Sequence, residues 1–154
     1  MFLRMERLIN RTQQGDLGEA SAIEWFTRAG AVVSKPLGYS PDYDLVVDFG
    51  RGLLRVQVKT SVCSPDSSGD RRWVIAVCTR GGNQSWQGLS KGLDAATIDY
   101  LFALTGDGRR WLIPADAVEG STNIKLGGTK YQGFEIEQAE SIEECVYGPR
   151  VILD

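Results

Sequence analysis

The hairpin at residues 40–61, SPDYDLVVDFGRGLLRVQVKTS, carries the side chains best suited to chemistry. Asp44 lies on its first arm, and Gln57 and Lys59 lie on its second arm, far from the GRG turn. The chain contains no histidine, which excludes Ser-His and Cys-His nucleophilic systems and histidine-ligated zinc sites. Any catalysis must therefore depend on carboxylates, lysine, hydroxyls or a hard metal ion.

Side chains alternate along strands, so the register of this hairpin decides which of its polar groups can meet. Matching the apolar faces of the two arms fixes the parity of the register. One allowed register sets Asp44 opposite Lys59, about 5 Å away, with Gln57 diagonally across from Asp44. It also sets Asp48 opposite Arg55, which we interpret as a surface ion pair. The sequence therefore predicts that Asp44, Gln57 and Lys59 converge at one end of one face.

A helix before the hairpin is predicted to complete this polar group. Residues 15–30, GDLGEASAIEWFTRAG, show apolar side chains at three-residue spacing, and Gly30 suits the end of a helix. The predicted buried stripe consists of Leu17, Ala20, Ile23 and Phe26. Glu19 precedes Ile23 by four residues and Phe26 by seven, so it borders this stripe. That position lets its carboxylate reach over the edge of a sheet.

The rest of the chain indicates a single α/β or α+β domain without internal repeats. Apolar, β-branched or aromatic runs predict strands at residues 31–34, 71–79, 98–105, 109–115, 123–126 and 134–137. The segment from Pro114 to residue 120 suits the start of a short helix. We assign one domain to residues 1–154, with a core at about 12–118 and a C-terminal elaboration at 119–154.

The polar residues and their neighbours together resemble the PD-(D/E)XK nuclease superfamily. The resemblance is carried by Glu19 in an opening helix, then PDYDLVVD at 41–48, then VQVKTS at 56–61. The chain looks like the Gln-X-Lys branch, which includes a group I intron homing endonuclease and relatives of Holliday-junction resolvases. The later IDYLFALTGDGRRWLIPAD, residues 98–116, is also similar to that branch. The Gln-X-Lys triplet at residues 57–59 is a weak signal alone. Asp44 upstream and Glu19 in the helix make the combined pattern more specific.

The resemblance implies a restriction-endonuclease-like fold, with a central mixed sheet flanked by helices, and metal-dependent endonucleolytic cleavage of DNA. It implies that Asp44 ligates Mg²⁺, which Mn²⁺ could replace, and that Lys59 positions or activates water. Glu19 would complete the acidic side. Asp42 belongs to the literal PD of the motif, but we prefer Asp44 because it lies on the strand itself. Gln57 departs from the superfamily pattern, where an acid is usual, and would offer the metal an uncharged carbonyl oxygen.

These residue types suit the hydrolysis of a phosphodiester. Mg²⁺ takes oxygen ligands, usually one or two carboxylates, with water and phosphate completing its shell. Lys59 is a point charge on a flexible stem and can orient water or stabilise the phosphate. Service as a base would require a neutral lysine, which the nearby carboxylates oppose. We therefore expect an electrostatic role for Lys59.

Contacts with DNA are predicted from one loop and from strand ends. Arg80, Trp86 and Lys91 belong to the polar segment RGGNQSWQGLSKG at 80–92. The two cations suit phosphate, and Trp86 suits either stacking on a base or holding the loop to the domain. Thr60 and Ser61 could donate to phosphate, although strand-end hydroxyls are often only structural. Recognition of a long or branched double-stranded site by so small a domain would require a homo-oligomer, a dimer or a tetramer.

The composition sets wider limits. The chain is 42% hydrophobic and 24% charged, as in ordinary globular proteins. Cys63, Cys78 and Cys145 are read as reduced thiols, and charges interrupt the N-terminal segment, so we expect a cytoplasmic protein without a membrane span. The net charge of −3 argues against a generally basic nucleic-acid binder but permits a local basic groove.

Two other interpretations stay open. Because Gln57 stands where an acid is usual, a protein of the same fold could bind DNA without cutting it. Alternatively, Asp44, Gln57 and Lys59 belong to a solvated sheet face in a structural or immunity-type protein, since cross-strand ion pairs are common and stabilise little. Cleavage assays distinguish the first interpretation, and salt-sensitive DNA affinity distinguishes the second.

Overall fold

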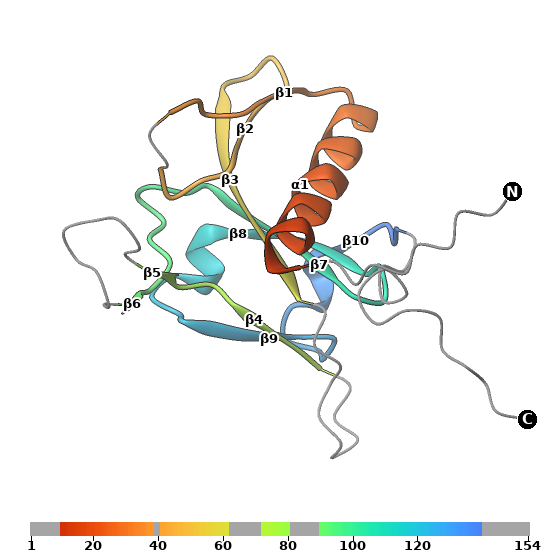
Figure 1. The fold of residues 1–154 in the computed structure, drawn as a ribbon, viewed down its shortest axis with the longest axis vertical. Coiled ribbons are helices and arrows are strands. Elements are labelled where there is room, and N and C mark those ends of the chain that lie inside the picture. Colours follow the sequence, from red (N-terminus) through yellow and green to blue (C-terminus); the bar gives the residue numbers. More distant parts are fainter. Residues whose placement is uncertain (1–9, 39–40, 62–71, 81–89, 140–154) are drawn as a thin grey trace, which may run out of the picture.

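The computed structural model describes residues 10–38, 41–61, 72–80 and 90–139. Helix and strand labels follow Figure 1. The elements are α1 (Arg11–Arg28), β1 (Val32–Ser34), β2 (Leu45–Asp48), β3 (Leu53–Ser61), β4 (Trp73–Ala76), β5 (Thr79–Arg80), β6 (Ser90–Lys91), β7 (Tyr100–Thr105), β8 (Arg110–Pro114), η1 (Ala115–Val118), β9 (Asn123–Leu126), η2 (Gln132–Phe134) and β10 (Glu135–Ile136). The predicted elements within these residues are therefore present, with η1 as a short 3₁₀ helix after Pro114.

The central sheet has six strands in the order β1-β2-β3-β7-β8-β10. β3 and β7 pair in parallel, and the other neighbours in this sheet pair antiparallel. Parallel pairing needs a long crossover, and the chain between β3 and β7 contributes β4, β5 and β6. The result is the mixed-sheet α+β fold class that the sequence predicts.

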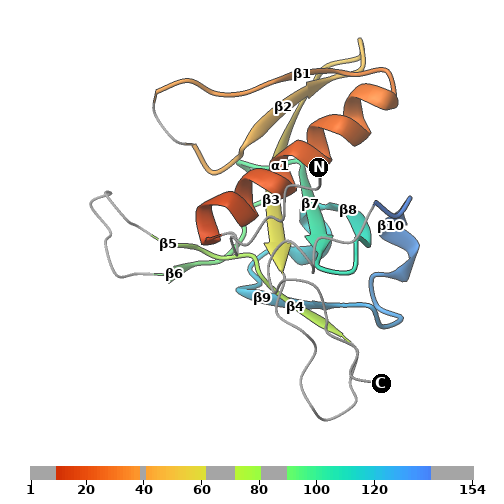
Figure 2. The same ribbon diagram turned by 45° about the vertical axis from the view of Figure 1, so that its right-hand side comes forward.

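Two layers cover the two faces of this sheet (Figures 1 and 2). α1 packs on one face, across β3 and β7. The second layer is the antiparallel pair β4–β9, which forms a separate two-stranded sheet. Among the described residues no helix is both long and apolar enough to cross a membrane.

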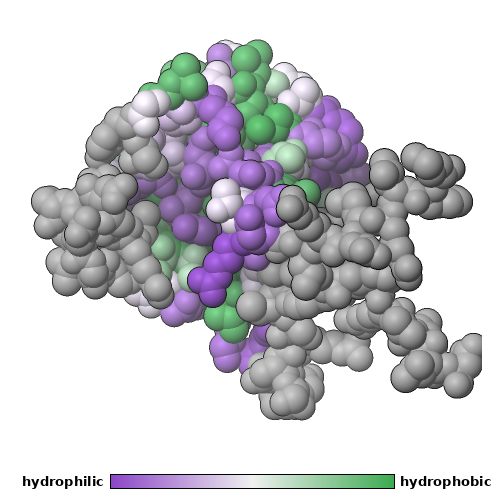
Figure 3. All heavy atoms as spheres, viewed as in Figure 1, coloured by the Kyte–Doolittle hydropathy of each residue, from purple (hydrophilic) through white to green (hydrophobic). Residues whose placement is uncertain are grey.

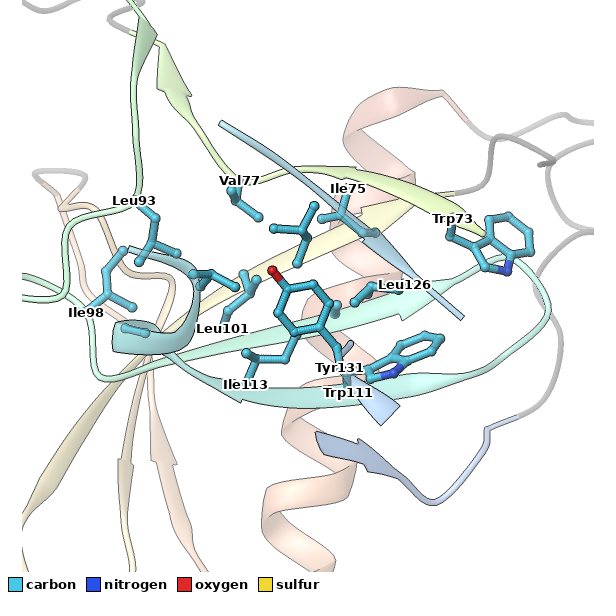
Figure 4. Close-up of a cluster of buried hydrophobic side chains, with 14 residues drawn as sticks. Trp73, Ile75, Val77, Leu93, Ile98, Leu101, Trp111, Ile113, Leu126 and Tyr131 are labelled. Atoms are coloured by element: carbon cyan, nitrogen blue, oxygen red, sulfur yellow. The ribbon is translucent and has the colours of Figure 1, made fainter. Parts of the chain in front are cut away.

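Alternation along the strands explains why there are two hydrophobic cores. On the helix side, Phe26 packs with Val47, Val56 and Phe102, all of which are buried. On the other side, side chains of β7 and β8 meet those of β4 and β9 around Tyr131 (Figure 4). Each face of the central sheet is therefore buried over part of its length, and the two layers fix the position of β3 between them.

α1 begins one turn earlier than predicted and rests on a different stripe. Asn10 caps its first turn in a capping box with Gln13, which places the start at Arg11. The buried positions are Gly18, Ala22 and Phe26, whereas the predicted Ala20 is exposed. The stripe follows four-residue spacing because the small residue Gly18 lets the helix approach β3 closely: a Cβ at Gly18 would lie 1.9 Å from Thr60 Oγ1.

The register of the opening hairpin differs by two residues from the predicted one. Val47 pairs with Leu54, and Asp48 pairs with Leu53 instead of Arg55. The turn decides this register, because Asp48 Oδ1 accepts a hydrogen bond from the Gly50 N–H at 2.6 Å. Gly50 and Gly52 both adopt positive φ there, at 81° and 127°.

The predicted pair of Asp48 with Arg55 is therefore wrong. Arg55 instead makes a two-pronged contact with Asp99, with Nε and Nη2 at 3.0 and 3.1 Å from its carboxylate oxygens. Asp99 also accepts from the Arg55 backbone N–H. This contact ties the start of β7 to β3.

Candidate active site

Asp44 is held at the point where the chain enters β2. Its backbone N–H donates to the Val56 carbonyl at 2.9 Å, and its Oδ2 accepts from the Val58 N–H at 2.7 Å. Both contacts place Asp44 beside residues 56–58, so the predicted position opposite Lys59 is corrected by the register shift. The side chain is partly buried. One carboxylate oxygen is thus fixed by the sheet, and the other makes no hydrogen bond to any described residue.

Gln57 lies in the middle of β3 and is only 3% exposed. Its Oε1 has no hydrogen-bond partner among the described residues. A buried acceptor without a partner costs roughly 1–3 kcal/mol, so native proteins keep few of them. Such an atom suits a cation or a bound water that the folded chain itself does not supply.

Lys59 follows Gln57 by two residues, so both side chains lie on the same face of β3. That face is opposite the one covered by α1, because Val56 and Val58 pack toward the helix. Lys59 is partly buried and makes no ion pair in the described part of the chain. Its electrostatic influence reaches Asp44, where it favours the ionised carboxylate.

The electrostatics of Asp44 connect it with two other predicted residues, Glu19 and Lys59. Burial raises the pKa of the Asp44 carboxyl above its ordinary value, and the charge of Glu19 adds to that rise. The Val58 N–H and the charges of Lys59 and Lys35 act in the opposite direction. Glu19 and Lys59 are therefore both close enough to Asp44 to influence its ionisation, and a cation beside Asp44 would stabilise the charged form.

Glu19 reaches the site from α1 but is paired with Lys35. The Lys35 ammonium contacts Glu19 Oε2, and the Glu19 side chain is 24% exposed. The sequence analysis did not single out Lys35, because the pair joins α1 to the segment after β1 and has no signature in local spacing. This ion pair neutralises the Glu19 carboxylate, one of the two acidic groups that the resemblance implied for the site.

Asp42, the aspartate of the literal PD, has other partners. Its Oδ2 accepts from Thr97 Oγ1 at 3.1 Å and lies 3.6 Å from Lys91 Nζ. Lys91 also lies 3.8 Å from Asp94. Asp42 therefore ties two loops together, which supports the preference for Asp44 at the site. It also means that Lys91, a predicted phosphate contact, is held by two carboxylates.

Two other predicted DNA contacts face the interior. Thr60 Oγ1 is buried beneath α1 next to Gly18, without a hydrogen-bond partner in the described structure, and Ser61 is 7% exposed. The structure does not bring these hydroxyls to the surface. Trp86 and the side chain of Arg80 lie outside the described residues.

The donor set can be tested against the implied metal. The side chains that could hold Mg²⁺ are those of Asp44, Gln57 and Glu19, all with oxygen donors, which fits a hard cation. Within the described segments, no three acidic or cysteine side chains gather closely enough to hold a metal by themselves. The unpartnered Gln57 Oε1 is the observation that favours a metal, since an amide oxygen can complete a set with only one or two carboxylates.

Polar and apolar side chains are unevenly distributed over the face of the molecule that Figure 3 shows. Hydrophilic side chains gather over the middle of this face, where the first turns of α1 lie in Figure 1. Apolar side chains are prominent in the upper part of the same view, where β1 and β2 lie in Figure 1. Exposed Val32 belongs to β1, Phe49 to the β2–β3 turn and Leu53 to the start of β3.

Comparisons with known proteins show which solved structures this chain resembles. A bacterial homing endonuclease, I-Ssp6803I, is similar in structure, with a TM-score of 0.66 and 22% sequence identity over 82% of this chain and 89% of that chain. The Holliday junction resolvase Hjc of Archaeoglobus fulgidus matches with a TM-score of 0.48 and 13% identity, over 80% of this chain and 90% of that one. No curated protein sequence matches the chain.

The family assignment follows from the sequence match. The family described as PD-(D/E)XK endonuclease matches residues 9–144, which is most of the chain. The protein therefore belongs to the PD-(D/E)XK endonuclease family, and the restriction-endonuclease-like fold class that the resemblance implied is confirmed. Membership in this family supports a nuclease function.

Proposed function

We propose that this protein is a metal-dependent DNA endonuclease that hydrolyses phosphodiester bonds in double-stranded or branched DNA, as a homing endonuclease or a junction resolvase does. The observation that carries the proposal is the buried Oε1 of Gln57, which has no hydrogen-bond partner among the described residues and lies on the same strand face as Lys59, beside Asp44. Family membership and the fold agree with it.

Each of the four candidate residues has a distinct part in the proposed reaction. Asp44, whose Oδ2 is fixed by the Val58 N–H, would hold Mg²⁺ together with the amide oxygen of Gln57. Mg²⁺ supplies charge stabilisation for the phosphate and a more acidic water, and Mn²⁺ would substitute. Lys59 orients the attacking water and stabilises the charge that develops on phosphate as the P–O bond breaks. Glu19 adds a second carboxylate to the site when its ion pair with Lys35 is broken.

One cleavage assay tests this proposal. Supercoiled plasmid and a cruciform substrate are incubated with Mg²⁺ and with wild type, Asp44→Asn or Lys59→Ala. We expect wild type to cut and both variants to lose at least about 100-fold in rate, since each removes a charge used in the transition state. Asp48→Asn is the matched control, because an asparagine at this turn can still accept from the Gly50 N–H.

A DNA-binding protein that does not cut is the second candidate. It is favoured by Gln57, which carries no charge, and by the lack of a three-acid cluster among the described residues. Binding of DNA by wild type without cutting, with either Mg²⁺ or Mn²⁺, would establish this candidate and refute the first. Gln57→Glu then gives a further check, because an added carboxylate at this position should strengthen metal binding.

A further inference from the structure

The β4–β9 sheet turns one face toward the core and the other toward solvent. Trp73 and Ile75 point inward, as do Ile124 and Leu126 on the partner strand. Lys125 pairs with Val74 on the outer face, and both are exposed. Because this sheet packs with Leu101 and Ala103 of β7, which pair with Gln57 and Lys59, it lies on the same face of the central sheet as those two residues.

A pocket of about 310 Å³ opens beside β9. Its polar lining side chains include those of Arg72, Asn123, Lys125, Thr129, Lys130 and Tyr131. Among the described residues, no aspartate or glutamate lines it. Positive charge is therefore concentrated in a concavity, which focuses the local potential more than the same charges would on a convex surface.

The lysines of this pocket differ from the described cations that carboxylates hold. The cations held by carboxylates include Arg28, Lys35, Arg55, Lys91, Arg109 and Arg110. Within the described part of the chain, Lys125 and Lys130 make no ion pair, although the net charge of the protein is −3. The Lys130 ammonium lies 5.2 Å from the centre of the Tyr131 ring, which holds it at the edge of the pocket. Two cations that have no carboxylate partner among the described residues and that line one concavity are suited to an anionic ligand.

The rest of the lining suits phosphate. Asn123 and Thr129 add an amide and a hydroxyl donor, the uncharged groups that accompany lysine and arginine in contacts with nucleic-acid backbones. Gly128 leaves room for the stem of Arg72: a Cβ there would lie 3.1 Å from Arg72 Cδ. The pocket therefore combines charge, neutral donors and space.

We infer that this pocket binds a phosphate of the DNA backbone outside the bond that is cut. The identity of the anion as DNA rests on the proposed function, whereas the charge of the pocket stands on the structure. The β4–β9 sheet lies on the same side of the central sheet as Gln57 and Lys59, and the inference requires one duplex to contact both the pocket and the candidate site. The contact reads no base, so it contributes affinity for any sequence and makes binding sensitive to salt.

The test measures equilibrium binding to random-sequence duplexes over a range of salt concentrations, in EDTA so that no cleavage occurs. Lys125→Gln should lower affinity uniformly across sequences and reduce the slope of log K against log salt by about 1, and the double variant with Lys130→Gln by about 2. Arg51→Gln is the charge-matched control, because Arg51 is an exposed residue of the β2–β3 turn. Thermal unfolding of each variant checks that the fold is retained.

The outcomes separate this inference from the proposed function. If the double variant binds with wild-type affinity and slope, the inference is wrong, whether or not the protein cuts DNA. An equal loss with Arg51→Gln would also overturn it, since net charge alone would then explain the effect. Loss of affinity in the lysine variants, with no cleavage by wild type in Mg²⁺ or Mn²⁺, would support the pocket while refuting the endonuclease.

Discussion

Asp44 experiences opposing influences that determine how the site responds to pH. Burial and the charge of Glu19 raise its pKa, while Lys59 and the Val58 N–H limit the rise. A metal binds the ionised form, so protons and metal compete at this carboxylate. Affinity for Mg²⁺ should therefore fall on acidification at a higher pH than for an ordinary aspartate.

The same pKa makes a prediction about stability without metal. A carboxyl whose pKa is higher in the folded state than in the unfolded state binds more protons when folded, so stability falls as pH rises through this interval. Wild type in EDTA should therefore lose stability between about pH 4 and the raised pKa of Asp44, and then change no further on this account. Asp44→Asn should lack this loss and be the more stable protein at pH 7.

Urea unfolding of both proteins from pH 3 to 8 measures this difference. A constant difference in the free energy of unfolding across the range would show that the pKa of Asp44 is not raised. Asp48→Asn is again the control, because Asp48 lies at the β2–β3 turn outside this site.

At the scale of elements, the position of α1 against β3 determines where Glu19 lies. Gly18 makes the close approach possible, since its missing side chain leaves room for Thr60 and Val58. Gln14 reinforces it by donating from Nε2 to the Thr60 carbonyl at 3.1 Å. A displacement of α1 would move Glu19 away from Asp44.

Two alanine substitutions in the same helix test this arrangement. Gly18→Ala places a Cβ 1.9 Å from Thr60 Oγ1 and should cost about 1–3 kcal/mol, because α1 must move or Thr60 must rotate. Gly15→Ala meets nothing within 4 Å and should stabilise by up to about 1 kcal/mol. Chemical denaturation compares the two, and equal effects would contradict the close approach.

The register of the hairpin shows how far sequence patterns reach at this scale. The apolar alternation correctly predicted which residues share a face, and it also allowed two registers that differ by two residues. The hydrogen bond from Gly50 to Asp48 selected one of them. Arg110 is a similar case: it is 1% exposed and contacts Glu24 on α1, a partner 86 residues away that no local pattern indicates.

At the scale of the whole molecule, the protein is small compared with a long or branched DNA site. One α-helix and three small sheets make up the regular structure that is described, apart from two short 3₁₀ helices. We propose that two or four copies act together, since recognition of a symmetric or branched site by a small domain requires a matching oligomer.

Sedimentation velocity with and without DNA tests this proposal. We expect a dimer or tetramer, either alone or on a cruciform substrate. A strict monomer in both conditions would count against it. The assignment of residues 1–154 to one domain remains a prediction as well.

The sequence by itself determined the fold class, most of the elements, and the residues Glu19, Asp44, Gln57 and Lys59 as candidates, because strand alternation and motif spacing are local properties. Only the tertiary structure decided the partners of these residues. It buried Gln57, joined Glu19 to Lys35, and turned Thr60 inward, since burial and pairing depend on layers that meet across distant parts of the chain. The cationic pocket beside β9 also depends on the tertiary structure, because Arg72 joins Lys125 and Lys130 only when β4 pairs with β9.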